Sequence, residues 1–201
     1  MKKFGIWFDF KIQPESEWIK FFDKLEDVNI SECFINANAS QLSYLIFLSK
    51  NYNFNIHGWV WTFNRPYDEN SSKNLDWYSV NKNGQNSYEY RPYVDYYQWL
   101  SPFSEGAREY IKDNISEIAS VDGLSSVHLD YVRYCDIFLP INLQKYYKIN
   151  QTHEFPEYDF GYHPNGRKSF KDKFGIDPLD IHDEEILKAV SYTHLTLPTT
   201  R

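Results

Sequence analysis

The sequence predicts an α/β fold built on a parallel sheet, and three observations predict it. Short apolar segments alternate with helical segments from residue 3 to residue 132, the order of strands joined by crossover helices. No glycine-rich phosphate loop follows the first apolar segment, which argues against a nucleotide-binding doubly wound sheet. Polar residues able to do chemistry follow each apolar segment, as at the mouth of a (β/α)8 barrel. An open sheet and a barrel both fit the order, and these polar residues favour the barrel.

Four segments are expected to be strands, because they are short, apolar and bounded by polar residues. They cover residues 3–10, 31–37, 54–63 and 125–132. Five segments are expected to be helical, covering residues 15–29, 40–52, 104–120, 166–174 and the start of a further helix at 182–190. In the first helix, Trp18, Phe21, Phe22 and Leu25 recur at helical spacing and would share one face. Ser40 is the expected N-cap of the second helix.

Two long polar segments rich in aromatic residues follow the third and fourth strands, at residues 64–102 and 135–165. Loops of this length are usually functional or contain small elements of their own. The last segment, SYTHLTLPTTR at residues 191–201, continues no helical face and resembles a translated sequencing adapter more than a real disordered terminus. The predicted organisation is therefore one barrel-like domain over residues 1–190 and an artefactual tail over 191–201.

The composition excludes several classes of protein. Hydrophobic residues make up 42% and charged residues 24% of the chain, which argues against disorder, and no apolar run is long enough to span a membrane. A net charge of −7 disfavours nucleic acid as a partner. The two cysteines have no disulfide or metal spacing, His153 and His163 match no standard metal site, and no cofactor motif is present. The first residues do not form a secretory leader, so a cytoplasmic location is the default expectation. The oligomeric state stays open.

Eight polar or aromatic residues are candidates for a site, because they lie in or after the strand ends that converge at the mouth of a barrel. They are Asp9 after the first strand, Asn36 after the second, Trp61, Asn64 and Arg65 after the third, and His128, Asp130 and Arg133 in or after the fourth. His128 and Asp130 alternate along one strand, so both should point to the same side. The aromatic fraction of 19% fits a carbohydrate cleft, although most of the loop tyrosines are expected to pack the loops onto the barrel.

Three segments carry a resemblance to a known family. Val121-Asp122-Gly123 followed by VHLDYVRY at 127–134 resembles the fourth-strand motif of the glycosyl-hydrolase-like 10 family, a group of (β/α)8 glycosidases. HGWVWTFN at 57–64 is similar to the third strand of that family, and FKDKFGIDP at 170–178 is similar to a later segment. The resemblance spans most of residues 3–188. This chain departs from the pattern by inserting Ser125-Ser126 and by having Cys135-Asp136 where a proline is common.

The resemblance implies a carbohydrate-active barrel that hydrolyses O-glycosidic bonds. Such hydrolysis needs two carboxyl groups, and Asp130 is the first candidate, as nucleophile or base, because a strand-borne Asp between Leu129 and Tyr131 needs a strong reason. Arg133 could pair with Asp130 and keep it ionised, or bind a sugar hydroxyl. The other candidates would bind sugar: Asp9, Asn36, Trp61, Asn64, Arg65 and His128. Structural roles stay open for each, including a rim Asp–Arg pair, a core His128, and Trp59 as barrel core.

The length conflicts with a whole barrel. A (β/α)8 barrel needs about 250 residues, and the strand pattern ends after the fourth strand, so the chain is expected to be the first four β/α units of a longer protein. The second carboxylate is not evident; Asp95, Glu105 and Asp136 would serve only by coincidence. The leading hypothesis is a fragment of a glycoside hydrolase, inactive and poorly soluble alone, because half a barrel exposes two sheet edges. The alternative is a non-catalytic carbohydrate-binding barrel.

Overall fold

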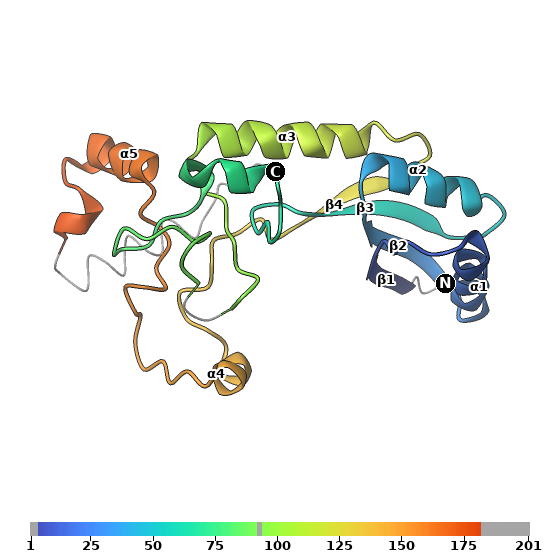
Figure 1. The fold of residues 1–201 in the computed structure, drawn as a ribbon, viewed down its shortest axis with the longest axis horizontal. Helices are drawn as coiled ribbons and strands as arrows, with labels where there is room; N and C mark the ends of the chain where they lie inside the picture. Colours follow the sequence, from blue (N-terminus) through green and yellow to red (C-terminus); the bar gives the residue numbers. More distant parts are fainter. Residues whose placement is uncertain (1–3, 92–93, 182–201) are drawn as a thin grey trace. The chain divides into compact units, whose positions relative to one another are not determined.

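The computed structural model describes residues 4–91 and 94–181, and it contains a four-stranded parallel sheet. The strands lie in the order β1-β2-β3-β4, the order in which they occur along the chain (Figure 1). Their bounds are Phe4–Asp9 for β1, Ile30–Asn36 for β2, Asn55–Trp61 for β3 and Ser126–Asp130 for β4. The predicted α/β class with a parallel sheet is confirmed. Strands β1, β3 and β4 are slightly shorter than their predicted segments, and β2 has the predicted length but begins one residue earlier. The predictions for residues 182–190 and 191–201 lie outside the described residues.

The chain divides into two compact units. The first contains the described part of Met1–Thr62 together with Tyr110–Asp130, and it holds the sheet. The second contains Phe63–Glu109 and the described part of Tyr131–Arg201, which are the two long segments that follow β3 and β4. Each unit has its own cluster of buried hydrophobic residues.

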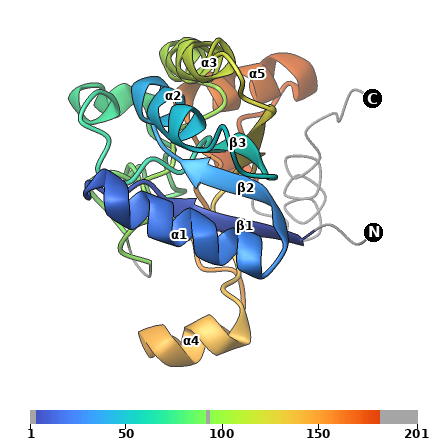
Figure 2. The same ribbon diagram turned by 90° about the vertical axis from the view of Figure 1, so that its right-hand side faces the viewer.

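In the first unit, three helices contribute to one apolar core. Helix α1 spans Glu15–Asp27, α2 spans Ala39–Leu48, and α3 spans Glu105–Ala119, of which the part from Tyr110 onward belongs to this unit. Figure 2 shows α1 and α2 lying along the sheet. The buried residues of α1 are Trp18, Phe22 and Leu25, with Phe21 partly buried beside them, so the predicted apolar face is confirmed.

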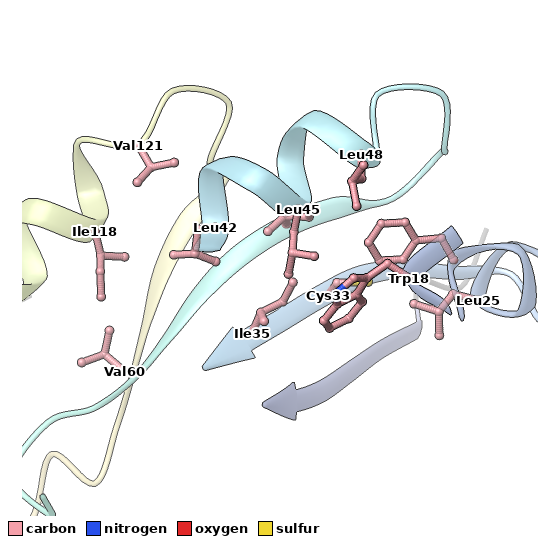
Figure 3. Packing of buried hydrophobic residues seen from close by; sticks show 12 residues of the cluster. Trp18, Leu25, Cys33, Ile35, Leu42, Leu45, Leu48, Val60, Ile118 and Val121 are labelled. Carbon is pink, nitrogen blue, oxygen red and sulfur yellow. The ribbon is translucent and has the colours of Figure 1, made fainter. Parts of the chain in front are cut away.

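Only one face of the sheet contributes to this core. Cys33 and Ile35 of β2 and Ile56 and Val60 of β3 belong to the buried cluster, and Figure 3 shows Leu42 and Leu45 of α2 above Ile35. Successive side chains of a strand alternate between faces, so their neighbours in sequence point to the opposite face. That opposite face carries most of the candidate site residues.

Gly58 of β3 lets α3 approach the sheet. A Cβ atom at this position would lie 2.6 Å from Ile118 Cγ2 and 3.4 Å from Leu42 Cδ1. Any larger residue would therefore push α3 or α2 away from β3.

The start of α2 differs from the prediction. The N-cap is Asn38, not Ser40: the Asn38 side chain accepts from the Gln41 backbone N–H at 2.9 Å, and the Gln41 side chain accepts from the Asn38 N–H at 3.0 Å. This reciprocal capping box satisfies two backbone donors, whereas a lone serine would satisfy one. Ser40 lies inside the first turn, and its hydroxyl donates to Asn38 Oδ1.

The second unit is made mainly of loops around an aromatic cluster. It contains α4 at Ile141–Tyr147, which the sequence did not predict, and α5 at Pro164–Phe174. Helix α5 begins two residues before its predicted start, because the His163 ring accepts from the Asn165 N–H and Pro164 occupies the first turn. The described residues of this unit also include 3-10 helices at Ser71–Lys73, Leu75–Trp77 and Pro178–Asp180.

Across residues 4–91 and 94–181, no helix is both long and apolar enough to cross a membrane.

Candidate functional site

All four strands end in a residue that the sequence marked as a candidate. Asp9, Asn36, Trp61 and Asp130 are the last residues of β1, β2, β3 and β4, respectively. Asp9 pairs in register with Asn36, and Trp61 pairs with Asp130. Because the strands are parallel, these four residues lie along one edge of the sheet, which is where ligands bind in α/β proteins.

At the β1–β2 end of this edge, two candidates bond to each other. The Asn36 amide donates to Asp9 Oδ1 at 2.9 Å. Asp9 is exposed and Asn36 is half-buried, so the pair is ordered by the bond while remaining open on the surface of the first unit. A carboxylate and an amide held together in this way offer both acceptors and a donor to hydroxyl groups.

At the β3–β4 end, Asp130 is held by a tryptophan. The Trp59 indole Nε1–H donates to Asp130 Oδ2 at 3.0 Å. Trp59 packs edge-on against Trp61, with ring centroids 5.9 Å apart. The main-chain carbonyl of Asp130 also accepts from the Thr62 N–H at 2.8 Å, which extends the strand ladder past the end of β3. Trp59 is thus in direct contact with the proposed carboxylate, a role that the sequence did not predict.

His128 lies on the same face two residues before Asp130. Its ring packs against Phe34 and Trp7, with centroid distances of 5.2 and 6.1 Å. Among the described residues, none forms a hydrogen bond with the His128 ring nitrogens. The ring is therefore fixed by aromatic contacts, while its nitrogens stay available to a ligand.

Asn64 and Arg65 belong to the second unit, where both hold the loop after β3. Asn64 is fully buried; its Oδ1 accepts from the Gln98 N–H at 3.0 Å, and its Nδ2 has no partner in the described chain. The Arg65 guanidinium lies 3.8 Å from Asp68 Oδ2. The burial of Asn64 assigns it to loop structure rather than to direct contact with a sugar.

Arg133 also belongs to the second unit, and its carboxylate partner there is Asp136. Arg133 Nη1 donates to Asp136 Oδ1 at 2.8 Å, and the Tyr97 hydroxyl donates to Asp136 Oδ2 at 2.6 Å. The guanidinium lies 4.9 Å from the centre of the Trp99 ring, within the range of a cation–π contact. Tyr131 adopts a φ of 52°, in the left-handed region, and turns the chain immediately after β4. These contacts give Arg133 a partner other than the Asp130 suggested by the sequence.

The groups of this cluster stabilise each other's protonation states. Burial and the hydrogen bond to Asp136 raise the pKa of Tyr97 above its ordinary value, so this phenol stays a donor. Burial acts to lower the pKa of Arg133, but the hydrogen bond to Tyr97 and the charge of Asp136 outweigh it and raise the pKa. Asp136 is thus engaged by two donors, which fits a loop anchor better than a second catalytic carboxylate.

A second polar group lies nearer the start of the strands, on the same face as Asp130. His57 bonds through Nδ1 to Ser126 Oγ at 2.7 Å and through Nε2 to Glu32 Oε2 at 2.8 Å. The His57 ring stacks on Phe34 at 4.5 Å, and Phe34 stacks on Trp7 at 4.6 Å. The sequence did not predict this arrangement. The alternation of side chains along β2, β3 and β4 would have placed Glu32, His57 and Ser126 on one face of the sheet.

Cysteine and metal chemistry find little support in the described chain. Burial, aided by the charge of Glu32, raises the pKa of the Cys33 thiol to about 12, so the thiol is protonated and unreactive at neutral pH. Among the described residues, no three His, Cys, Asp or Glu side chains gather closely enough to hold a metal ion.

Comparisons with known proteins identify the fold. No family model matches the chain, and no curated protein matches it. Two solved structures are similar. One is a beta-galactosidase from the psychrophilic Marinomonas ef1, with a TM-score of 0.52 and 12% identity over 64% of this chain and 21% of that chain. The other is a polyextremophilic beta-galactosidase from the Antarctic haloarchaeon Halorubrum lacusprofundi, with a TM-score of 0.57 and 10% identity over 97% of this chain and 28% of that chain.

The chain therefore shares its α/β fold with parts of two beta-galactosidases, at low sequence identity. It spans less than a third of the length of either beta-galactosidase. Identity this low establishes the fold alone, and activity has to be argued from the site.

Proposed function

We propose that this chain forms the first four β/α units of a (β/α)8 glycoside hydrolase of the glycosyl-hydrolase-like 10 type, with Asp130 as a catalytic carboxylate. One observation carries the proposal: β1, β2, β3 and β4 end in Asp9, Asn36, Trp61 and Asp130 along one edge of a parallel sheet. Active sites of (β/α)8 enzymes lie at this edge. The likeness to two beta-galactosidases supports the same fold.

The substrate in this proposal is a polysaccharide or glycoconjugate. Asp130 acts on the anomeric carbon as nucleophile, or on a water molecule as base. His128 offers unpartnered ring nitrogens to a sugar hydroxyl, Asp9 and Asn36 offer a bonded acceptor–donor pair, and Trp61 offers a ring face. Asn64, Arg65 and Arg133 order the loops that follow β3 and β4.

Hydrolysis also needs a second carboxyl group, about 5–5.5 Å from the first for retention and about 6.5–9.5 Å for inversion. In this proposal a later strand of the complete barrel supplies it, so residues 4–181 alone hold half of the catalytic pair. We therefore expect no turnover from the 201-residue chain by itself.

The test compares Asp130→Asn with Asp122→Asn in the full-length gene product, on a panel of aryl glycosides that includes β-galactosides. Asp122 is exposed in the turn after α3 and serves as the matched control. We expect Asp130→Asn to reduce turnover by about a thousandfold or more, because the amide can neither attack nor accept a proton, while Asp122→Asn leaves turnover unchanged. Unchanged turnover in Asp130→Asn would overturn the catalytic assignment. Saccharide binding without turnover by the wild-type protein would favour a non-catalytic carbohydrate-binding barrel.

A further inference from the structure

The contact between Trp59 and Asp130 connects two strands diagonally. In the β3–β4 ladder, Trp59 is paired with His128, and Trp61 is paired with Asp130. The Trp59 indole therefore reaches two pairs further along the ladder, to the next pair on the same face, and places Nε1 3.0 Å from Asp130 Oδ2. Diagonal neighbours on one face of a sheet are within reach of large aromatic side chains.

The indole is held in place by its surroundings. Its ring meets Trp61 edge-on at 5.9 Å, and both rings are half-buried. Trp59 belongs to neither described apolar cluster, because its neighbours Gly58 and Val60 point toward the helices and Trp59 points away from them. Packing in the apolar core of the first unit therefore does not explain its position.

An indole N–H donates one hydrogen bond and accepts none. Its bond to Oδ2 orients the Asp130 carboxylate, and the indole carries no positive charge that would neutralise a nucleophile. A lysine or arginine in the same place would order the carboxylate but reduce its nucleophilicity.

We propose that Trp59 is a positioning residue that orients the Asp130 carboxylate for its part in the reaction. This inference rests on the proposed function of Asp130. Trp59 acts through Asp130, so its loss affects the chemical step more than the binding of substrate.

The first experiment examines the contact without any substrate. In the full-length gene product with 15N-labelled tryptophan, the Trp59 indole N–H resonance is assigned by its absence in Trp59→Phe. We expect the chemical shift of this resonance to differ between the wild-type protein and Asp130→Asn, because the substitution changes the acceptor of the indole hydrogen bond. The Trp77 indole, in the second unit, is the internal reference. A Trp59 resonance unaffected by Asp130→Asn would overturn the inference.

The second experiment measures the consequence for turnover in the full-length gene product. Trp59→Phe keeps an aromatic ring and removes the donor, and we expect kcat to fall by about 10- to 100-fold with KM changed by less than about threefold. Trp77→Phe, which makes the same change at a half-buried tryptophan of the second unit, is the matched control. A KM effect that equals or exceeds the kcat effect would make Trp59 a substrate-binding or structural residue instead.

A shape-preserving replacement covers the case in which Trp59→Phe does not fold. Benzothienylalanine at position 59 has nearly the shape of tryptophan and lacks the N–H, so it removes only the hydrogen bond. The same loss of kcat in this variant supports positioning, and wild-type kcat overturns it. The failures of the two proposals are distinguishable: if Asp130→Asn keeps full turnover, the proposed function fails; if only Asp130→Asn loses turnover, the positioning role fails alone.

Discussion

The two units of this protein pair their buried backbone donors and acceptors in different ways. The first unit satisfies its backbone groups through a four-stranded ladder and buries aliphatic and aromatic residues beneath helices. The described part of the second unit has no comparable sheet, and it holds eleven of the thirteen buried polar residues found among residues 4–91 and 94–181. In the second unit, the side chains of asparagine, serine and glutamine form the hydrogen bonds that the strand ladder forms in the first. Buried backbone donors and acceptors must be paired in either case, so a loop unit pairs them with side chains.

Asn81 illustrates the second solution. It is fully buried, and its Oδ1 accepts from the backbone N–H groups of Asn83 and Gln85, at 3.1 and 2.8 Å. Its Nδ2 donates to the carbonyl of Glu157, a residue far away in sequence. One side chain thus closes a turn and joins the two long segments of the second unit. Stability therefore depends mainly on buried apolar volume in the first unit and on individual hydrogen bonds in the second.

The largest expected effect comes from removing apolar volume in the first unit. Phe22 of α1 is completely buried and contacts the rings of Trp18, Tyr52 and Phe54. We expect Phe22→Ala to lower the free energy of unfolding by about 3–5 kcal/mol, because it loses burial and leaves a cavity. Urea denaturation measures the loss, and hydrogen exchange by mass spectrometry locates it in residues 4–62. Phe47→Ala is the matched control, since Phe47 is 62% exposed on α2. An equal loss in both variants would contradict the assigned core.

The same contrast explains which parts of the structure the sequence predicts. Strands and apolar helix faces have a period, and so the order of β1 to β4, the buried face around Phe22 and the strand-end positions of Asp9 and Asp130 were all predictable. Hydrogen bonds such as Asn81 to Glu157, or His163 to the Asp76 carbonyl at 2.9 Å, join distant residues and have no period. The second unit was therefore predicted only as two loops.

Smaller errors have the same origin in specific contacts. Helix α4 was missed because it is only seven residues long. It begins after Pro140 and is followed by Lys148, whose backbone lies in the left-handed region. The contact of Trp59 with Asp130 was missed because spacing along one strand does not show which residue on the neighbouring strand a long side chain reaches. Strand alternation predicted the faces of His128 and Asp130, but the partners of each side chain depend on packing between strands.

An intermediate effect is expected from removing one hydrogen-bonding side chain in the second unit. Asn81→Ala removes the hydrogen bonds to the N–H groups of Asn83 and Gln85 and to the carbonyl of Glu157, and each such bond contributes about 0.5–1.5 kcal/mol. We expect the free energy of unfolding to fall by about 2–3 kcal/mol, with faster hydrogen exchange in residues 79–87. Asn83→Ala, an exposed neighbour, is the control and should change little. If Asn81→Ala proved as harmless as Asn83→Ala, the second unit would not depend on these bonds.

The smallest expected effect is a pH-dependent one at the end of α5. Arg167 binds Asp177 through two hydrogen bonds, of 3.0 and 2.7 Å, and the Asp177 side chain also accepts from the Leu179 N–H. The hydrogen bonds from Arg167 and Leu179 lower the pKa of Asp177 below its ordinary value. A carboxyl group whose pKa is lower in the folded state stabilises the fold above its unfolded pKa of about 4, and this stabilisation is lost as the pH falls through the folded value. Because the pair is partly exposed, we expect Asp177→Asn to cost less than about 1 kcal/mol at pH 7.

The difference between wild type and Asp177→Asn should therefore be constant from pH 7 to pH 5 and shrink below about pH 4. Urea denaturation at a series of pH values, with hydrogen exchange in residues 164–181, measures it. Asp172→Asn removes a carboxylate whose partner Lys168 is 75% exposed, and it should show almost no difference at any pH. A difference for Asp177→Asn that grew on acidification would mean that the neutral acid, not the carboxylate, is the form this part of the second unit stabilises. In that case the Arg167–Asp177 pair would stabilise the fold through the geometry of its hydrogen bonds rather than through its charge.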